Sequence, residues 1–402
     1  MILPLGDAPN PRGVPFMTYA LIAANVAAYA LITVPLGATP ADPTDPALRE
    51  YLAVVTRDLP QVSLRELLRG ISSYDLFLFR HGFRPGHPAV GPLFASLFLH
   101  AGFLHLFGNM LFLWIYGDNV EHRLGRLPFL VCYLMTGVAA TLFHTVFASH
   151  SDLPLVGASG AISGVLGFYF LWFPRNEVRL LFLFFPFFMD VIMVSARVVL
   201  AVYLVADNVL PFLLTRGGGG GGVAYGAHIG GFLGGLGMAW LLDRRELLRQ
   251  PDEYKGVRVA AVPGETPGRT IAHAVAEGRF PQAAQDYFAL ESGATRRMLT
   301  PEDSLALADW LRRNGHDEAA LVVYRRHLRD YPHGPGAAEA HVGAALVLLE
   351  AFGQATPAYQ HLLDALDLDP SPETAAQARA ALAAIRARQK RQVGHPSGRK
   401  PI

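Results

Sequence analysis

The sequence predicts an all-α protein made of a six-span membrane helix bundle and a soluble helical domain. Three observations point to this fold class. Residues 1–245 contain several stretches without Asp, Glu, Lys or Arg, and each is about 20 residues long, enough to cross about 30 Å of hydrocarbon. The chain after Arg244 is rich in Ala, Arg, Glu and Asp and has no such stretch. Glycine-containing turns recur in this second part at a nearly constant spacing, which is typical of stacked helix pairs.

Six segments have the length and apolar character of transmembrane helices. They are residues 16–36, 98–117, 127–148, 155–173, 197–214 and 223–242. The fifth is the weakest, because it carries Asp207 and Pro211. The apolar run from Leu180 to Met189 before it is cut off by Asp190 and is too short to cross. We interpret this run as an interfacial or loop segment, and a distorted seventh span is the alternative.

Positive charges predict the orientation of the spans. The arginines that cluster in short connections follow spans 2, 4 and 6: Arg123 and Arg126, Arg175 and Arg179, and Arg244 and Arg245. Cytoplasmic loops are enriched in Lys and Arg, so the N-terminus and the C-terminal domain are expected in the cytoplasm. The first span lacks the short apolar region and cleavage site of a secretory signal and is expected to be retained. Ala-rich content without eukaryotic targeting signals favours a bacterial inner membrane.

The second part of the chain is predicted to be a helical repeat domain. Residues 246–269 hold charges, Gly and Pro and are interpreted as a linker between a membrane domain, residues 1–245, and helices over 270–385. The turns recur 37 and 38 residues apart at Gly278-Arg279, Gly315-His316 and Gly353-Gln354. This pattern resembles tetratricopeptide (TPR) repeats and implies a cytoplasmic protein partner, with an unrelated helical bundle as the alternative. Residues 386–402, with Arg and Lys among polar residues, are expected to be a disordered tail.

Composition excludes several classes of function. The 34 basic and 33 acidic residues give a net charge of +1, which offers no basis for a nucleic-acid partner. The single cysteine, Cys132, rules out an intramolecular disulfide and a cysteine-based zinc site. The sequence therefore has no zinc-ligand spacing.

Polar side chains inside the spans cost free energy, so each requires a function or a partner. His105 and Asn109 are four residues apart, on one face of the second span. Ser159 stands among small residues near the start of the fourth span, and His228 lies a few residues into the sixth. In the orientation set by the arginines, all four lie in the extracytoplasmic parts of their helices. They share a similar depth, because each helical residue rises about 1.5 Å.

A serine and a histidine at one depth fit acyl transfer. His228 would take the proton of Ser159, and the alkoxide would attack a peptide carbonyl. The Ser159 backbone N–H, His105 and Asn109 are candidate donors to the tetrahedral oxyanion. No acidic residue has a place behind His228, which predicts a dyad, and Asp207 is assigned to packing or gating. Taken singly, each motif has another interpretation. The Gly-Ala-Ser-Gly run is also typical of a helix-packing seam. His228 could be a packed polar residue that bonds to a backbone carbonyl.

Four segments, in this order, resemble rhomboid intramembrane serine proteases: HAGFLHLFGNMLFLW, GDNVEHRLG, GASGAISGVLG and AHIGGFLGG. The resemblance covers residues 15–245. It implies that Ser159 is the nucleophile, His228 the base, and His105 and Asn109 the oxyanion donors. It also implies supporting roles for other residues of the motifs: Gly157 and Gly160 beside the serine, Gly231 and Gly235 in helix packing, His100 near the site, and Glu121 with Arg123 as a cytoplasmic-side pair.

The resemblance implies an endopeptidase that works inside the lipid bilayer without a cofactor. Its substrates would be transmembrane segments of other membrane proteins, cleaved near the extracytoplasmic end. Such a helix must unwind locally, so segments with Gly or Pro are expected to be preferred. Ser163 departs from the pattern, because some members of the family have a tyrosine there that stacks on the catalytic histidine.

Three other functions compete with proteolysis. A rhomboid-like pseudoprotease would lack Ser159 or His228, and both are present. A transporter uses intramembrane His and Asp in proton relays, but this leaves the serine and histidine motifs at one depth unexplained. A membrane-tethered TPR scaffold needs only one span.

The run Gly217–Gly222 before His228 is interpreted as a mobile cap over the site, with a low-complexity insertion as the alternative.

Overall fold

The computed structural model forms two compact units, described separately below. It describes residues 2–11, 13–58, 64–184, 188–215, 223–248, 251–254, 267–290 and 299–393. The first unit comprises Met1–Ala8 and Gly13–Trp240, and the second comprises Pro9–Arg12 and Leu241–Ile402. The glycine run Gly217–Gly222 lies outside the described residues, so its predicted capping role stays a prediction.

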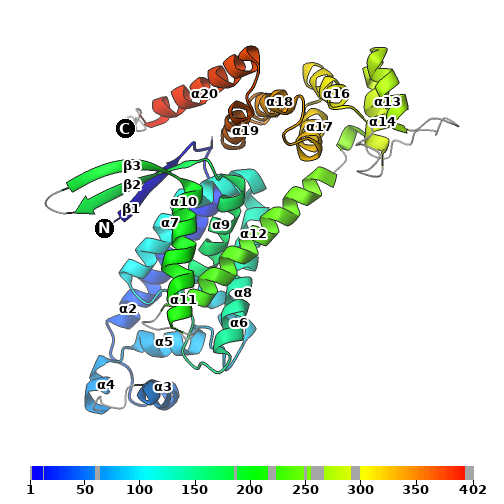
Figure 1. Cartoon of the computed structure of the whole chain (residues 1–402). Coiled ribbons are helices and arrows are strands. Elements are labelled where there is room, and N and C mark those ends of the chain that lie inside the picture. Colours follow the sequence, from blue (N-terminus) through cyan, green and yellow to red (C-terminus); the bar gives the residue numbers. More distant parts are fainter. Residues whose placement is uncertain are drawn as a thin grey trace, which may run out of the picture. The chain divides into compact units, whose positions relative to one another are not determined.

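Helices dominate the first unit (Figure 1). Each of the six predicted spans overlaps one continuous helical segment. Two of these segments are composite: α1 (Phe16–Ala28) continues through η1 (Tyr29–Thr33) into α2 (Val34–Gly37), and α10 (Ala196–Leu204) continues through η3 (Val205–Val209) into α11 (Leu210–Leu214). The others are the single helices α7 (Phe103–Leu124), α8 (Arg126–Ala148), α9 (Ser159–Trp172) and α12 (Tyr225–Leu248). Three of these are long and apolar enough to cross a membrane by themselves: Phe16–Gly37, Arg126–Ala148 and Ala196–Leu214.

A fourth span arises if Val90–Phe98 and Phe103–Leu124, which meet at 85°, cross together. α9 is apolar but has only 14 residues. Helices suited to a membrane are therefore present within the described residues, and the count of six remains a prediction.

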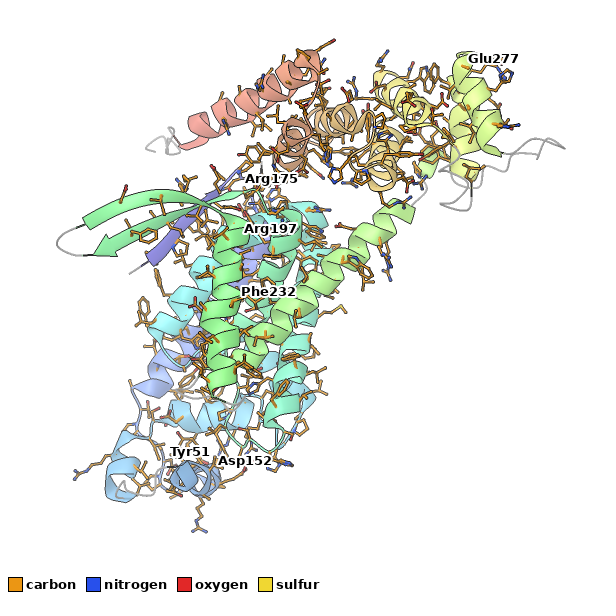
Figure 2. The ribbon with its side chains drawn as sticks, in the orientation of Figure 1. Tyr51, Asp152, Arg175, Arg197, Phe232 and Glu277 are labelled. Carbon is orange, nitrogen blue, oxygen red and sulfur yellow. The ribbon has the colours of Figure 1, made fainter. Side chains whose placement is uncertain are left out.

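The first long connection is folded into short helices. They are α3 (Pro46–Asp58), α4 (Leu64–Gly70), α5 (Ser73–His81), α6 (Val90–Ala95) and the 3-10 turn η2 (Ser96–Phe98). A reciprocal pair of hydrogen bonds between Ser72 and Asp75 caps α5. Phe83 pairs with Leu155 in an isolated antiparallel bridge, which ties this connection to the segment that precedes Ser159. Figure 2 shows the labelled Tyr51 and Asp152 at one end of the unit, and Arg175 and Arg197 at the other.

The structure is mostly helical, compatible with the predicted all-α bundle, but it also contains a three-stranded antiparallel sheet that was not predicted. Its strands are β1 (Ile2–Ala8), β2 (Glu177–Phe184) and β3 (Phe188–Ser195), in the order β1-β2-β3. The run Leu180–Met189 was expected to be interfacial or a loop, and its described residues belong to two paired strands instead. Apolar residues dominate both faces of this hairpin, so the run lacks the period-two alternation that identifies a half-buried strand. β1 was missed because Pro4 and Gly6 interrupt it, at a bulge in the pairing.

The second unit consists of α13 (Pro267–Ala276), α14 (Phe280–Ala289), α16 (Pro301–Arg313), α17 (Asp317–Asp330), α18 (Ala337–Glu350), α19 (Ala355–Asp367) and α20 (Pro372–Val393). Gly278, Gly315 and Gly353 separate α13 from α14, α16 from α17 and α18 from α19, with φ of +73°, +78° and +64°. These left-handed values explain why each turn uses glycine. The helices share one buried core, and the TPR-like assignment remains a prediction.

The predicted boundaries of the linker and the tail differ from the helices observed. α12 extends to Leu248, and the 3-10 turn η4 (Asp252–Tyr254) also falls within the expected linker. α20 extends to Val393, so residues 386–393, expected in a disordered tail, are helical. Ala, Arg, Gln and Lys are strong helix formers, and here this propensity outweighs the polar composition.

Candidate active site

Ser159 is the first residue of α9, and the segment before it adopts a backbone that requires glycine. Gly157 has φ of +123°, and its N–H donates to the Ser96 carbonyl at 2.8 Å. A Cβ at this position would lie 2.7 Å from Cε1 and 2.8 Å from Nε2 of His105. The glycine therefore lets the His105 ring approach the chain two residues before Ser159, in a conformation that L side chains rarely adopt.

His228 on α12 contacts Ser159 directly. The distance between His228 Nε2 and Ser159 Oγ is 2.8 Å, which is a hydrogen bond. The two residues are 69 positions apart in the sequence and meet because α9 and α12 pack together. The geometry is that of a serine hydroxyl paired with the imidazole that would remove its proton.

Glycines let α9 and α12 approach backbone to backbone. A Cβ at Gly231 would lie 2.0 Å from the Gly160 carbonyl oxygen, and one at Gly235 would lie 1.9 Å from that of Gly164. The labelled Phe232 of Figure 2 is 1% exposed, and its carbonyl oxygen occupies the space that a Cβ at Gly167 would need. α9 also packs against α7, α8 and α10, and Figure 1 shows it between α10 and α12. Close packing of small residues therefore sets the distance between nucleophile and base.

The candidate oxyanion donors lie on α7 and at the start of α9. Asn109 is 8% exposed, and its Nδ2 has no hydrogen-bond partner among the described residues. A buried amide nitrogen without a partner is costly, so it suits a group that donates to a bound ligand. The Ser159 N–H is one of the first N–H groups of a helix, which have no intrahelical acceptor. His105, beside Gly157, completes the set.

The remaining predicted residues pack around the helices that hold Ser159 and His228. His100 is fully buried, its ring centroid is 5.1 Å from that of His105, and its carbonyl accepts a hydrogen bond from Tyr74. Glu121 accepts hydrogen bonds from the N–H groups of Met17 and Thr18 and so caps the start of α1. The Arg123 guanidinium lies over the Trp172 ring, 4.1 Å from its centroid. Glu121 and Arg123 thus connect α7 to α1 and α9 respectively.

Sequence reasoning missed Asn208, which lies behind His228. Its Oδ1 is 2.6 Å from His228 Nδ1, and the residue is 1% exposed. The predicted dyad rested on the absence of a carboxylate behind His228 and left amide side chains out. Asp207, the carboxylate in the fifth span, is exposed. Asn208 was detectable as a second polar residue in the fifth span, but the π-helical turn η3 that carries it was not.

Comparison with known proteins gives a consistent family for this part of the chain. Residues 88–245 match the rhomboid domain. The matched stretch contains Ser159, His228, His105, Asn109 and Asn208. The match and the apolar helices together indicate a membrane protein.

Three similar proteins have rhomboid names. The chain is 32% identical over 156 residues to rhomboid protein 1, mitochondrial, of Saccharomyces cerevisiae, covering 38% of this chain and 42% of that protein. It is 32% identical over 181 residues to rhomboid-like protein 11, chloroplastic, of Arabidopsis thaliana, covering 44% of this chain and 59% of that protein. It is 43% identical over 75 residues to rhomboid protease GluP of Bacillus subtilis, covering 19% of this chain and 14% of that protein. The matched stretch thus spans about half the length of the first two relatives.

The packing of the rhomboid domain predicts opposite effects for two glycines of α12. Gly235→Ala is expected to lower the free energy of unfolding by about 1–3 kcal/mol, because the methyl group forces the α9 and α12 backbones apart. A Cβ at Gly237 meets nothing within 4 Å. Gly237→Ala should therefore leave stability unchanged or slightly raise it through helix propensity. Thermal unfolding in detergent compares the two, and equal melting temperatures would contradict the packing argument.

Proposed function

We propose that the chain is an intramembrane serine endopeptidase that cleaves transmembrane segments of other membrane proteins near their extracytoplasmic ends. The observation that carries the proposal is the 2.8 Å contact between Ser159 Oγ and His228 Nε2 inside a rhomboid domain. A relative that is 43% identical over 75 residues is named a rhomboid protease. A pseudoprotease has no use for this pair, so the contact favours catalysis over a binding role.

The reaction follows from the positions of these groups. His228 Nε2 takes the Ser159 proton as Oγ attacks the carbonyl carbon of the scissile peptide bond. The Ser159 N–H, His105 and Asn109 then donate to the oxyanion. His228 returns the proton to the leaving amine as the C–N bond breaks. A water molecule, deprotonated by His228, hydrolyses the resulting ester and regenerates Ser159. No metal or other cofactor takes part in this proposed mechanism.

The location and partners are part of the same proposal. The arginine pattern supports a cytoplasmic N-terminus and C-terminal domain. The Ala-rich content without eukaryotic targeting signals supports a bacterial inner membrane for the rhomboid domain. The TPR-like domain would bind a cytoplasmic protein partner.

A fluorophosphonate probe tests the proposal directly, because it reacts with an activated serine and not with a packed one. The purified full-length chain is expected to be labelled at Ser159, as read by mass spectrometry, and Ser159→Ala should not be labelled. Absence of labelling in folded parent protein would reject the enzymatic function. Undiminished labelling of Ser159→Ala would reject Ser159 as the nucleophile.

A further inference from the structure

We propose that Asn208 is a positioning residue for the base. Its side-chain oxygen holds His228 in the tautomer that carries the proton on Nδ1 and leaves Nε2 free to accept the proton of Ser159. The inference rests on the proposed function and adds a residue that acts through His228 rather than on the substrate. Four contacts carry it, and they connect α9, α12 and the α10–η3 segment.

The orientation of the Asn208 amide follows from its second partner. Asn208 Nδ2 donates to the Tyr203 carbonyl oxygen at 2.8 Å. A carbonyl oxygen can only accept, so the amide nitrogen must face Tyr203 and the amide oxygen must face His228. The contact of 2.6 Å between Asn208 Oδ1 and His228 Nδ1 is therefore a hydrogen bond that Nδ1 donates.

The tautomer of His228 follows from this donor. A neutral imidazole has one N–H, so a proton on Nδ1 leaves Nε2 as the acceptor. The 2.8 Å contact with Ser159 is then an O–H of the serine donating to Nε2. This is the protonation state that a general base needs before the reaction, and the partner of Nδ1 selects it.

A π-helical turn brings Asn208 to this position. In η3 the Leu210 N–H donates to the Val205 carbonyl five residues earlier, instead of four. Such turns occur at functional sites because the extra residue re-aims the side chains that follow. Asn208 lies in this turn and is buried, whereas its neighbour Asp207 is exposed.

A fourth contact ties this segment to α9 next to the nucleophile. The Tyr203 hydroxyl and Ser163 Oγ are 2.8 Å apart, and Ser163 lies one helical turn after Ser159. Hydrogen bonds thus lead from Ser159 to His228 and Asn208, and back through Tyr203 to Ser163. The tyrosine that some family members carry at position 163 is replaced here by a serine that bonds to Tyr203 from another helix.

An amide fills this position at a lower cost in stability than a carboxylate would. The site lies within the membrane domain, where an unpaired charge is costly. The amide accepts the Nδ1–H bond without adding a charge, and its own N–H₂ satisfies the Tyr203 carbonyl. When His228 takes the proton, Nδ1–H keeps its partner, so the base does not reorient during the reaction.

Three variants of the full-length chain test the proposal. Asn208→Ala removes the acceptor opposite Nδ1. Asn208→Asp keeps an acceptor there and loses the donor to Tyr203. Thr215→Val is the matched control, because Thr215 donates the same kind of side-chain bond to a carbonyl of its own helix, that of Pro211. The measurements are the rate of fluorophosphonate labelling of Ser159, kcat and KM for a transmembrane substrate, and the melting temperature.

Asn208→Ala is expected to lower both the labelling rate and kcat by roughly 10-fold to 10²-fold, the value of one hydrogen bond to a group that becomes charged, with KM little changed. Asn208→Asp should recover most of this loss per folded molecule even if it melts earlier, and Thr215→Val should match the parent. Parent-like labelling of Asn208→Ala, or equal losses in the Ala and Asp variants, would overturn the positioning role. A parent chain that fails to react would instead reject the proposed function on which this role depends.

Discussion

Ser159→Ala and His228→Ala are each expected to lower cleavage of a glycine-containing transmembrane substrate by roughly 10⁴-fold to 10⁶-fold, the usual loss when one member of a nucleophile–base pair is removed. The physical reason is the 2.8 Å contact between Ser159 Oγ and His228 Nε2, since neither residue can act without the other. The double variant should therefore be no worse than the more damaged single one. Turnover of purified protein at saturating substrate gives the measurement.

Melting temperature separates this catalytic loss from misfolding. Ser159 is half-buried and truncation removes one oxygen, so Ser159→Ala should melt close to the parent. His122→Ala is a control on α7, where His122 bonds through Nδ1 to the Asp118 carbonyl, and it should retain cleavage. Near-parent turnover in either Ser159→Ala or His228→Ala would remove the dyad from the mechanism.

Asn109→Ala is expected to lower kcat by roughly 10²-fold to 10³-fold with little change in KM, the usual loss for one oxyanion donor. Its buried Nδ2 has no partner among the described residues, so the unliganded fold gains little from it. The melting temperature should therefore stay close to that of the parent. Turnover and melting temperature are to be measured on the same preparation.

A second buried asparagine of α7 provides the matched control. Asn119 is 2% exposed, and its Nδ2 donates to the Asp7 carboxylate at 2.9 Å, so it is tied into the fold. Asn119→Ala should lower the melting temperature while turnover per folded molecule stays normal. If Asn109→Ala instead behaves like Asn119→Ala, Asn109 is a packing residue and not an oxyanion donor.

The parts of the site predictable from sequence were those with a local signature. Ser159 and His228 each stand among small residues in an apolar segment, and His105 and Asn109 lie at helical spacing, so residue type and spacing were enough to propose them. Asn208 has no such signature. Its direction depends on a π-helical turn, and an inserted residue in a helix leaves no periodic trace in a single sequence.

The fold likewise has parts that could be predicted from the sequence and parts that could not. Long apolar helices and the glycine turns of the second unit follow from length, composition and φ requirements. The β1–β2 pairing does not, because it joins segments about 175 residues apart, and one of them contains both Pro4 and Gly6. Pairing partners at such separation depend on tertiary packing, which strand propensity alone does not encode.

Hydrogen bonds between distant segments also constrain how many times the chain crosses the membrane. Paired residues must lie on one side of the bilayer, so the number of crossings between them is even. Phe83 pairs with Leu155, and only α7, with its bent partner α6, and α8 lie between them among helices of candidate length. If α8, which is long and apolar enough, crosses the membrane, α7 is expected to cross as well.

The same parity applies between β1 and β2, which are separated by α1–α2, α7, α8 and α9. If α1–α2, α7 and α8 each cross, a total of three crossings would leave the strands on opposite faces, so we expect α9 to be the fourth. Its 14 residues rise about 21 Å, which is less than the hydrocarbon thickness of about 30 Å. A helix this short that crosses has an end below the surface of the bilayer, and Ser159 lies at one of its two ends.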